Sequence, residues 1–352
     1  MTILAINPGS TSTKIAVYEN EKPLMERNIK HSADELKKFA TVIDQFEYRK
    51  EIILKELKTQ GIPVQFDAVI GRGGLAKAIE SGVYAVNDRM IEDMRSTPHQ
   101  HACDLGCMLA HDIAEQIPGC PSYIADTGRV EELNEEARIC GSPMFKRICI
   151  WHALNQRAIA RRHARSIGKR YEDLNLIICH LGGGISVAAH DHGRAVDVNN
   201  SLDGEGPFSP ERAGSLPVGD LIHLCFSGKY TEEELRARIA GNAGLKAHLG
   251  THDMMEIEDR IANGDKHAEL IVNAMIYHIA KEVASKGAVL YGKVDAIIFT
   301  GGIARSDYVI PRLRDRVAYL APTYVYPGEN ELEALALNAL AALRGECKVK
   351  EY

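Results

Sequence analysis

Two stretches that lie about half a chain apart follow the same plan, and this similarity restricts the fold more than any other feature of the sequence. Residues 3–20 (ILAINPGSTSTKIAVYEN) and 176–193 (LIICHLGGGISVAAHDHG) each contain an apolar segment, a polar residue at its end, a glycine-containing turn and a second segment. Short apolar segments bounded by turn residues favour β-strands. The repeat therefore predicts two related domains that face a cleft.

The turns of both copies differ from an ordinary hairpin turn. A tight hairpin uses about two residues, usually Asn-Gly or Asp-Gly, whereas here Gly9 precedes four hydroxyl side chains and Lys14. In the second copy, Gly182–Gly184 let backbone N–H groups approach an anion without interference from a Cβ atom, and Ser186 can add a hydroxyl. A glycine turn without a ligand is the alternative, but three consecutive glycines favour phosphate binding.

Two further glycine motifs follow predicted strands. Residues 300–304 (TGGIA) form a strand-to-helix turn, and residues 71–76 (GRGGLA) fit the loose G-x-G-x-x-A dinucleotide pattern, although no acidic residue follows at the expected place. Arg72 is more informative. An arginine between glycines at a strand end has little structural work to do, and its guanidinium suits a carboxylate or a phosphate.

Length, charge and cysteine usage exclude several classes of protein. The 352 residues suffice for two cores, and a formal charge of −6 without a basic, aromatic-rich stretch argues against nucleic-acid or membrane-surface binding. The N-terminus lacks a signal-peptide pattern, and no run of about 18 apolar residues could span a membrane. Eight cysteines without a C-x-x-C pair favour reduced thiols in a cytoplasmic protein.

Cys103, Cys107 and His111 share one stripe of a helix that is expected to begin near Pro98. Such a stripe can bind zinc, but no matching ligand pair occurs elsewhere in the sequence. The preferred interpretation is an ordinary helix face with small buried thiols.

The rest of the chain mixes strands and helices, as α/β proteins do. Ser32-Ala-Asp-Glu35 is a capping-box pattern, and the apolar spacing after it predicts a helix that continues through Phe46. Helices are also expected at 151–168, at about 266–287 and from about Glu331. Further strands are expected at residues 66–70, 123–125, 174–179, 185–189, 194–198, 294–299 and 323–326.

Six motifs, spread over nearly the whole chain, resemble the acetate/butyrate kinase family. They are NPGSTSTK, ADT, WHALNQRAIAR, HLGGGIS, SLDGEGPFSPERAG and TGGIA. The resemblance implies an α/β fold of two duplicated ribonuclease-H-like domains, as in actin-like ATPases, with an interdomain nucleotide cleft. We place the N-terminal domain at 1–148 plus about 332–352 and the C-terminal domain at 149–331. A homodimer or higher homo-oligomer through the C-terminal domain is also implied.

The activity that the resemblance implies is reversible phosphoryl transfer from ATP to a short-chain fatty acid, which gives ADP and an acyl phosphate, with Mg²⁺ as cofactor. The family uses the first hairpin turn for phosphate and magnesium, so Asn7 is expected at the metal together with Glu331, for which Glu329 and Glu333 are alternatives. The expected nucleotide-binding residues are Ser10, Ser12, Lys14, His180, Gly182, Gly183, Gly184, Asp253, Gly301 and Gly302.

Four residues match catalytic positions of the family. Arg72 matches the arginine that contacts the substrate carboxylate, and Asp126 matches the acidic residue. His152 and Arg212 match the pair that steadies the transferring phosphoryl group, whose equatorial oxygens need donors and positive charge. A carboxylate is already a nucleophile, so Asp126 is expected to position magnesium or its water rather than to remove a proton.

Two departures from the acetate-kinase pattern concern the acyl pocket. Gly74 stands where those enzymes carry a valine that narrows the pocket, and Trp151 replaces a phenylalanine. We expect Gly74 to make room for a longer chain and Trp151 to form the far wall. Since each buried CH₂ contributes about 0.8 kcal/mol, butyrate or a branched C4–C5 acid is the expected substrate.

Other functions of the same fold agree less well with the sequence. A chaperone-like ATPase needs a substrate-binding domain, for which 352 residues leave no room. A sugar kinase needs a polar sugar pocket, whereas Arg72 beside glycines suits a carboxylate. A non-catalytic scaffold would not need the set Asn7, Arg72, Asp126, His152 and Arg212.

Overall fold

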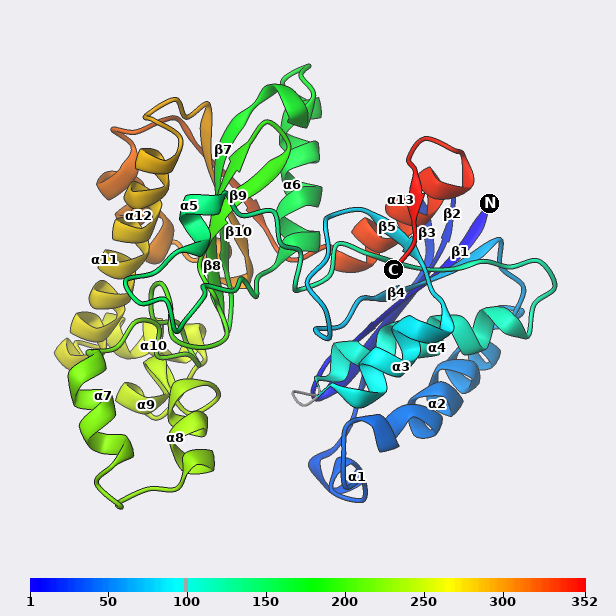
Figure 1. The fold of residues 1–352 in the computed structure, drawn as a ribbon, viewed down its shortest axis with the longest axis horizontal. Coiled ribbons are helices and arrows are strands. Elements are labelled where there is room, and N and C mark those ends of the chain that lie inside the picture. The colour runs from blue at the N-terminus through cyan, green and yellow to red at the C-terminus, as the bar shows by residue number, and fades with distance from the viewer. Residues whose placement is uncertain (98–100) are drawn as a thin grey trace. The chain divides into compact units, whose positions relative to one another are not determined.

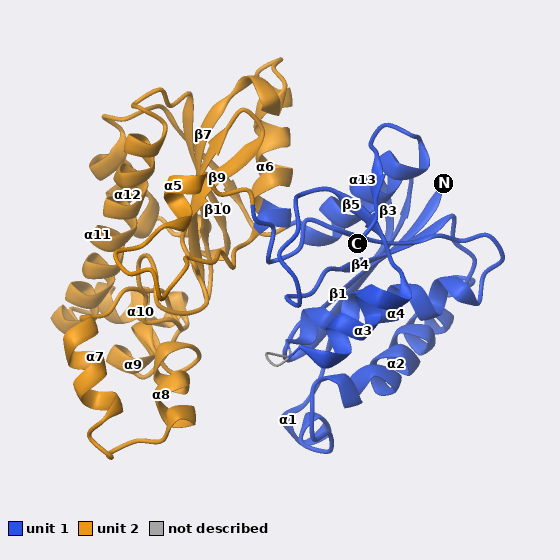
Figure 2. Cartoon of the chain, viewed as in Figure 1, with its two compact units in different colours: residues 1–131, 153–155, 330–352 blue, residues 132–152, 156–329 orange. Residues whose placement is uncertain are grey.

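The computed structural model describes residues 1–97 and 101–352 (Figure 1). They form two compact units: unit 1 contains residues 1–131, 153–155 and 330–352, and unit 2 contains residues 132–152 and 156–329 (Figure 2). Within the described ranges, no helix is long and apolar enough to cross a membrane.

The described part of unit 1 contains a seven-stranded sheet in the order β12-β5-β6-β4-β1-β2-β3. The predicted hairpin is present, because β1 and β2 pair antiparallel with Asn7 opposite Lys14. Strand β3 extends the meander, and β4 and β6 add in parallel on the other side of β1. The strands are β1 Thr2–Pro8, β2 Ser12–Glu19, β3 Lys22–Lys30, β4 Ala68–Arg72, β5 Val83–Ala85, β6 Ser122–Ala125 and β12 Val349–Lys350.

The described part of unit 2 repeats this arrangement with five strands in the order β11-β10-β7-β8-β9. Again the first three strands pair antiparallel, and two further strands add in parallel beside the first. The predicted duplication is therefore confirmed in both strand order and direction. The strands are β7 Asn175–Leu181, β8 Ile185–Asp191, β9 Arg194–Val198, β10 Ala296–Gly301 and β11 Thr323–Pro327.

Successive side chains of a strand point to opposite faces of the unit 2 sheet, and helices cover both of these faces. Ile177 and Cys179 join a core with the long helix α11, whereas Leu176 and Ile178 join a separate core with α6. Successive strand residues point to opposite faces, so a continuously apolar strand is expected where both faces are covered. The helices of unit 2 are α5 Glu135–Arg138, α7 Val218–Cys225, α8 Glu232–Ile239, α9 Gly244–Leu249, α10 Met254–Ala262, α11 Lys266–Val289 and α12 Val309–Val317, and α6 Ala153–Ser166 belongs to unit 2 from residue 156 onward.

Unit 1 combines early and late parts of the chain. Helix α13 contacts β1 and β4, and α4 packs so closely on β4 that a Cβ atom on Gly71 would lie 1.9 Å from the carbonyl oxygen of Gly106. Only glycine allows this approach, which fixes the end of β4 where Arg72 lies. The helices are α1 Ala33–Leu36, α2 Phe46–Thr59, α3 Asp88–Ser96, α4 Leu105–Glu115 and α13 Glu331–Leu343.

One expected helix differs from the structure, and the start of another cannot be compared with it. Ser32 does cap a helix with Glu35, but this helix ends at Leu36, and a second start follows where the Thr41 hydroxyl accepts from the backbone N–H of Asp44 at 3.3 Å. The helix predicted through Phe46 is therefore two helices. The predicted helix start at Pro98 lies outside the described residues.

The domain limits also differ, because residues 132–148 pack with unit 2. The backbone N–H of Asn134 donates to the carbonyl of Val196 at 2.9 Å. Arg147 pairs with Asp197 at 3.2 Å. These contacts join the segment to β9, and no local sequence signal marks them.

Candidate active site in two parts

The first part of the candidate site begins at the turn between β1 and β2 in unit 1. The backbone N–H of Gly9 closes the turn onto the carbonyl of Ser12 at 2.7 Å, and Ser10 is exposed at its tip. Arg49 of α2, which is fully buried, donates to the carbonyls of Gly9 and Ser12 and to the Thr13 hydroxyl at 2.9, 3.1 and 3.0 Å. Sequence reasoning missed Arg49, because an arginine on a helix normally faces solvent.

Three predicted site residues from β1, β4 and α13 meet in unit 1. Nη1 of Arg72 forms an ion pair with Oε1 of Glu331, and Nδ2 of Asn7 donates to Oε2 of the same carboxylate at 2.6 Å. The side chains of Arg72 and Glu331 are 13% and 11% exposed. An ion pair shielded from water in this way holds both side chains in one geometry.

Position favours Glu331 over the two alternatives. Glu333 lies on the exposed side of α13, where it accepts from Asn330 at 3.3 Å. Glu329 belongs to unit 2 and lies 3.8 Å from Nε2 of His180. Glu331 contacts both Arg72 and Asn7 through its two carboxylate oxygens.

Asp126 follows β6, whose last residue is paired with Arg72 on the neighbouring parallel strand. Its backbone has φ 41°, in the left-handed region that L-residues rarely adopt. Oδ1 accepts from the backbone N–H of Gly82 at 3.0 Å, and the side chain is buried. A buried carboxyl group in a strained conformation, beside the end of the Arg72 strand, is typical of a functional position.

Gly74 does not open space for an acyl chain on the side where a side chain would project. A Cβ atom on Gly74 would lie 2.1 Å from Oδ1 of Asp104 and 2.5 Å from Sδ of Met94. Asp104 is buried and accepts from the backbone N–H of Leu75 at 2.8 Å. The expected role of Gly74 is therefore wrong in its physical reason, since two packed side chains fill the volume that valine would take.

The second part of the candidate site lies in unit 2 around two stacked histidines. The rings of His152 and His180 lie 3.7 Å apart between centroids and 9° from parallel. His180 is paired across the β7–β8 hairpin with Ser186, whose hydroxyl lies 2.8 Å from Nδ1 of His152. The glycine turn between these strands thus starts and ends beside the predicted catalytic histidine.

Ser209 attaches the segment that carries Arg212 to the glycine turn. Its buried hydroxyl donates to the carbonyl of Gly183 at 2.5 Å and accepts from the backbone N–H of Arg212 at 3.1 Å. Among the described residues, Nε of Arg212 has no hydrogen-bond partner although it is buried. A buried, unsatisfied guanidinium nitrogen next to backbone donors suits an anionic ligand.

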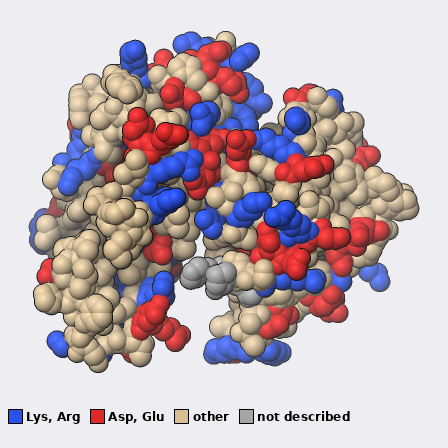
Figure 3. All heavy atoms as spheres, in the orientation of Figure 1, with Lys and Arg blue, Asp and Glu red and all other residues tan. Residues whose placement is uncertain are grey.

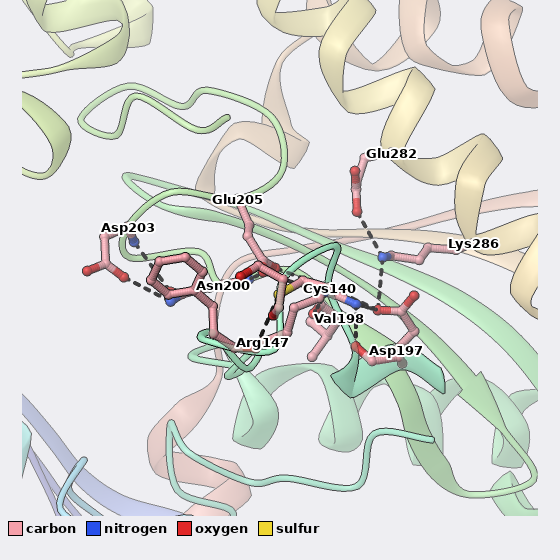
Figure 4. Close-up of polar contacts among 12 residues, drawn as sticks. Cys140, Arg147, Asp197, Val198, Asn200, Asp203, Glu205, Glu282 and Lys286 are labelled. Carbon is pink, nitrogen blue, oxygen red and sulfur yellow. Dashed lines mark hydrogen bonds and ion pairs between the residues drawn. The ribbon is translucent and has the colours of Figure 1, made fainter. Parts of the chain in front are cut away.

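Arg147 contacts Glu205 in the loop that precedes Arg212 (Figure 4). Its Nε and Nη2 donate to Oε1 and Oε2 of Glu205 at 3.1 Å each, and Nη1 and Nη2 contact Oδ1 of Asp197 at 3.2 Å. Burial opposes the charge, but the two carboxylates hold the pKa of Arg147 above its usual range. Asp197 also contacts Lys286 of α11 at 3.4 Å. Sequence reasoning missed Arg147, since its two carboxylate partners lie 50 residues or more away along the chain.

The other predicted residues lie in unit 2 as follows. Gly301, at the end of β10, has φ 89° and would place a Cβ atom 2.4 Å from the carbonyl of Leu181, while Gly302 is exposed. Because β10 runs parallel to β7, these glycines lie at the same sheet edge as His180. Trp151 is buried with its ring edge on His190. Asp253 caps α10, where it accepts from the N–H of Met255 at 2.9 Å.

The two cysteines of the predicted stripe are buried thiols, as preferred from the sequence, although Cys103 lies in the 3₁₀ turn Ala102–Asp104 and only Cys107 lies on α4. Cys103 and Cys107 are both buried, and this burial raises the pKa of each thiol. His111 instead lies 3.3 Å from the hydroxyl of Ser122. Within residues 1–97 and 101–352, no group of three or more His, Cys, Asp and Glu side chains is arranged to hold a metal.

Charges of both signs share the surface. On the face shown in Figure 3, Lys and Arg side chains lie among Asp and Glu side chains. The totals, 42 basic and 48 acidic residues, are also close. A nucleic-acid interface usually shows a broad patch of positive charge. The surface in view has no broad patch of one sign.

Known proteins match the chain over part or all of its length. Residues 147–317 match the model of the Acetokinase family. The chain is 61% identical to the probable butyrate kinase of Bacteroides thetaiotaomicron over 352 residues, which is the full length of both proteins. It is 51% identical to butyrate kinase 1 of Clostridium acetobutylicum, with 99% of each chain covered.

Solved structures share the fold at low sequence identity. Acetate kinase from Porphyromonas gingivalis superposes with a TM-score of 0.77 at 20% identity, covering 97% of this chain and 99% of that chain. A propionate kinase from Francisella tularensis gives 0.74 at 19% identity, covering 96% and 98%. The duplicated α/β architecture is thus that of the acetate and propionate kinases.

Proposed function

Because the chain belongs to the acetokinase family and, within it, to the butyrate kinases, we propose that it transfers a phosphoryl group reversibly between ATP and butyrate or a branched C4–C5 acid. The products are ADP and the acyl phosphate. A short-chain fatty acid kinase that uses ATP is the activity shared by the named relatives. The length of the acid and the roles of single residues are the finer parts of the proposal.

The observation that carries the proposal is the assembly around the glycine turn of unit 2. His152, the turn 182–184 and Arg212 are joined through the hydroxyls of Ser186 and Ser209. Backbone donors of one hairpin turn, with an imidazole and a guanidinium held beside it, suit a phosphoryl group whose charge is spread over three oxygens. The partnerless Nε of Arg212 within the described structure supports the same conclusion.

In the proposed reaction, a carboxylate oxygen of the acid attacks the γ-phosphorus while the bond to the oxygen that bridges the β- and γ-phosphates breaks. The electron pair of that bond leaves with ADP, so no proton has to be removed. Arg72 binds the acid carboxylate, and His152 and Arg212 contact the equatorial oxygens. Asp126 would position magnesium or a water bound to it near the transferred phosphoryl group.

The residues of unit 1 fit a magnesium ion. Asn7 and Glu331 offer an amide oxygen and a carboxylate, and Mg²⁺ prefers oxygen ligands, with one or two carboxylates plus phosphate oxygens and water. The ion would neutralise phosphate charge when bound. Ser10, Ser12 and Lys14 would contact the terminal phosphates, and Gly182–Gly184, Gly301 and Gly302 the rest of the nucleotide.

The test is an acyl-phosphate trapping assay with the purified protein, ATP, magnesium and a panel of straight and branched C2–C6 acids. We expect hydroxamate formation with the highest kcat/KM for a C4 or C5 acid. Absence of product with every acid, or a preference for acetate, would contradict the proposal.

Arg72→Leu is the matched variant for the carboxylate role, since leucine cannot replace a guanidinium that binds a carboxylate. We expect the KM for the acid to rise far more than the KM for ATP. An unchanged KM for the acid would make Arg72 a structural partner of Glu331 only.

A further inference from the structure

Behind His152, a line of side-chain hydrogen bonds runs into the core of unit 2. Nδ1 of His152 lies 2.8 Å from the hydroxyl of Ser186, which accepts from Nε2 of Gln156 at 2.9 Å. Oε1 of Gln156 lies 3.0 Å from Nε2 of His190, and Nδ1 of His190 lies 2.6 Å from the hydroxyl of Tyr171. The four residues behind His152 are all buried. We call this line the Tyr171–His152 chain.

At the inner end of the Tyr171–His152 chain, the donors and acceptors permit only one direction of hydrogen bonding. Oε1 of Gln156 can only accept, so Nε2 of His190 carries the proton. Burial, followed by the charge of Arg157, lowers the pKa of His190 to about 3, so the ring is neutral at physiological pH. Nδ1 of His190 is therefore an acceptor, and the hydroxyl of Tyr171 donates to it.

Donors and acceptors can be assigned in the same way at the outer end of the Tyr171–His152 chain. Nε2 of Gln156 donates to the hydroxyl oxygen and to the carbonyl of Ser186, at 2.9 and 3.1 Å. The backbone N–H of His152 also points to the Ser186 hydroxyl oxygen, at 3.5 Å. With its oxygen accepting from two sides, Ser186 directs its own proton to Nδ1 of His152. A neutral histidine that accepts at Nδ1 carries its proton on Nε2.

We propose that Gln156, whose amide is held by the Ser186 carbonyl and by Nε2–H of His190, acts through the Ser186 hydroxyl to set the Nε2–H tautomer of His152, while Tyr171 holds the ring of His190. The four residues behind His152 are then positioning residues for the phosphoryl transfer, a role that rests on the proposed function. Nε2–H is a donor and suits a phosphoryl oxygen, whereas the other tautomer would present a lone pair to an anion. The stacked ring of His180 keeps the imidazole plane of His152 fixed, so the tautomer alone decides what is presented.

The Ser186 carbonyl accepts from Nε2 of Gln156 at 3.1 Å and so keeps this amide in one orientation. Replacement of the amide itself should therefore reverse the outer end of the Tyr171–His152 chain. In Gln156→Glu, the oxygen that takes the place of Nε2 accepts, and Ser186 donates to it instead of to Nδ1 of His152. Nδ1 of His152 must then donate to Ser186, which moves the proton of His152 from Nε2 to Nδ1.

The test is long-range ¹H–¹⁵N NMR on protein labelled with ¹⁵N-histidine, with His152→Gln used to assign the His152 signals. We expect Nδ1 of His152 to give an unprotonated-type shift in the wild type and a protonated-type shift in Gln156→Glu. The matched control is Gln116→Glu, which changes an exposed amide whose Nε2 donates to the carbonyl of Asp112 at 3.1 Å. An unchanged His152 tautomer in Gln156→Glu, or the same change in the control, overturns the proposal.

Kinetics provide a second readout. We expect kcat of Gln156→Glu to fall by about 10- to 100-fold, as for other groups that orient a functional histidine, with little change in the KM for ATP. Ser186→Ala should behave alike, and Ser186→Thr, which restores the hydroxyl, should recover activity. Failure of Thr to rescue a folded protein overturns the proposal. If the wild type phosphorylates no acid, the proposed function fails, while the NMR result still decides the tautomer.

Discussion

The role of the Arg212 side chain can be tested separately from that of the loop that carries it. Its backbone is held by Ser209, so Arg212→Ala should leave the loop in place. We expect kcat to fall by about 10²–10³, the usual effect of losing one donor to developing charge, while ATP binding measured by calorimetry changes little.

Arg170→Ala is the matched control, because that side chain in the same unit is 73% exposed. Near-normal turnover of Arg212→Ala would remove Arg212 from the catalytic residues.

Gly74 leads to a prediction about stability rather than about acyl length. In Gly74→Val the new side chain collides with Asp104 and Met94, and overpacking of this kind costs about 1–3 kcal/mol. We expect a lower free energy of unfolding in urea. Gly141→Val is the control, since a Cβ atom there meets nothing within 4 Å. Wild-type stability together with a shift of preference toward acetate would restore the pocket interpretation of Gly74.

At the level of residues, the sequence reveals a functional side chain when its neighbours in the sequence are unusual for its residue type. Arg72 could be predicted because glycines flank it at a strand end, and it does meet Glu331. Arg49 and Arg147 could not, because each meets oxygen atoms that are distant in sequence and have no local pattern. Gly74 was predicted to leave space, but a missing side chain shows only that none fits, and not whether the space is empty.

Among the elements, helix α10 gives Asp253 a structural role that its motif does not reveal. Asp253 accepts from the backbone N–H of Met255 at the start of the helix. Loss of such a cap costs about 1 kcal/mol, so Asp253→Ala should lower the unfolding midpoint.

Asp253→Asn separates this role from nucleotide binding, since asparagine caps equally well but carries no charge. We expect Asp253→Asn to keep wild-type stability and a wild-type KM for ATP. A raised KM with normal stability would instead support the expected nucleotide contact.

Strands were easier to predict than helices. Strand β9 lies at the predicted residues 194–198, because Gly193 precedes it and Asn199 and Asn200 follow it. The helix predicted from Ser32 through Phe46 failed, because its apolar spacing continues across the second start at Thr41 and Asp44. Periodicity detects a buried stripe, but it does not detect a cap that interrupts the helix.

For the whole molecule, two buried histidines predict that stability falls in mild acid. Burial is the main cause that lowers the pKa of His190 to about 3 and that of His31 to about 4. Both values lie below the ordinary histidine pKa of about 6.5, so the unfolded chain binds protons first. The stability is complete above about pH 6.5 and is lost progressively below it, by up to about 1.4 kcal/mol per pH unit for each histidine.

Urea unfolding at about pH 7 and about pH 5 tests this, since most carboxyl groups titrate below that window. We expect His190→Gln to show a smaller loss than the wild type. His267→Gln, which removes an exposed histidine, should show the wild-type loss. Equal stability of the wild type at both pH values would contradict the prediction.

The duplicated architecture was predictable from one pair of similar stretches, because each stretch builds the first hairpin of its sheet. The limits of the units were not. Residues 132–148 join unit 2 through Asn134 and Arg147, and these contacts depend on where β9 lies in space. A repeat thus determines the number and kind of domains, whereas long-range contacts determine which one a connecting segment joins.

The return of residues 330–352 to unit 1 affects how the protein is made. On the ribosome, residues 1–131 emerge first, and the whole of unit 2 is translated before α13 and β12 appear. Until then the nascent sheet lacks the buried side chains of α13, which include Leu332, Leu335 and Leu340. Arg72 meets Glu331 only after that late segment has emerged. A chain released before residue 330 would therefore contain a complete unit 2 but no Arg72–Glu331 ion pair, so this pair can form only after the ribosome has translated unit 2.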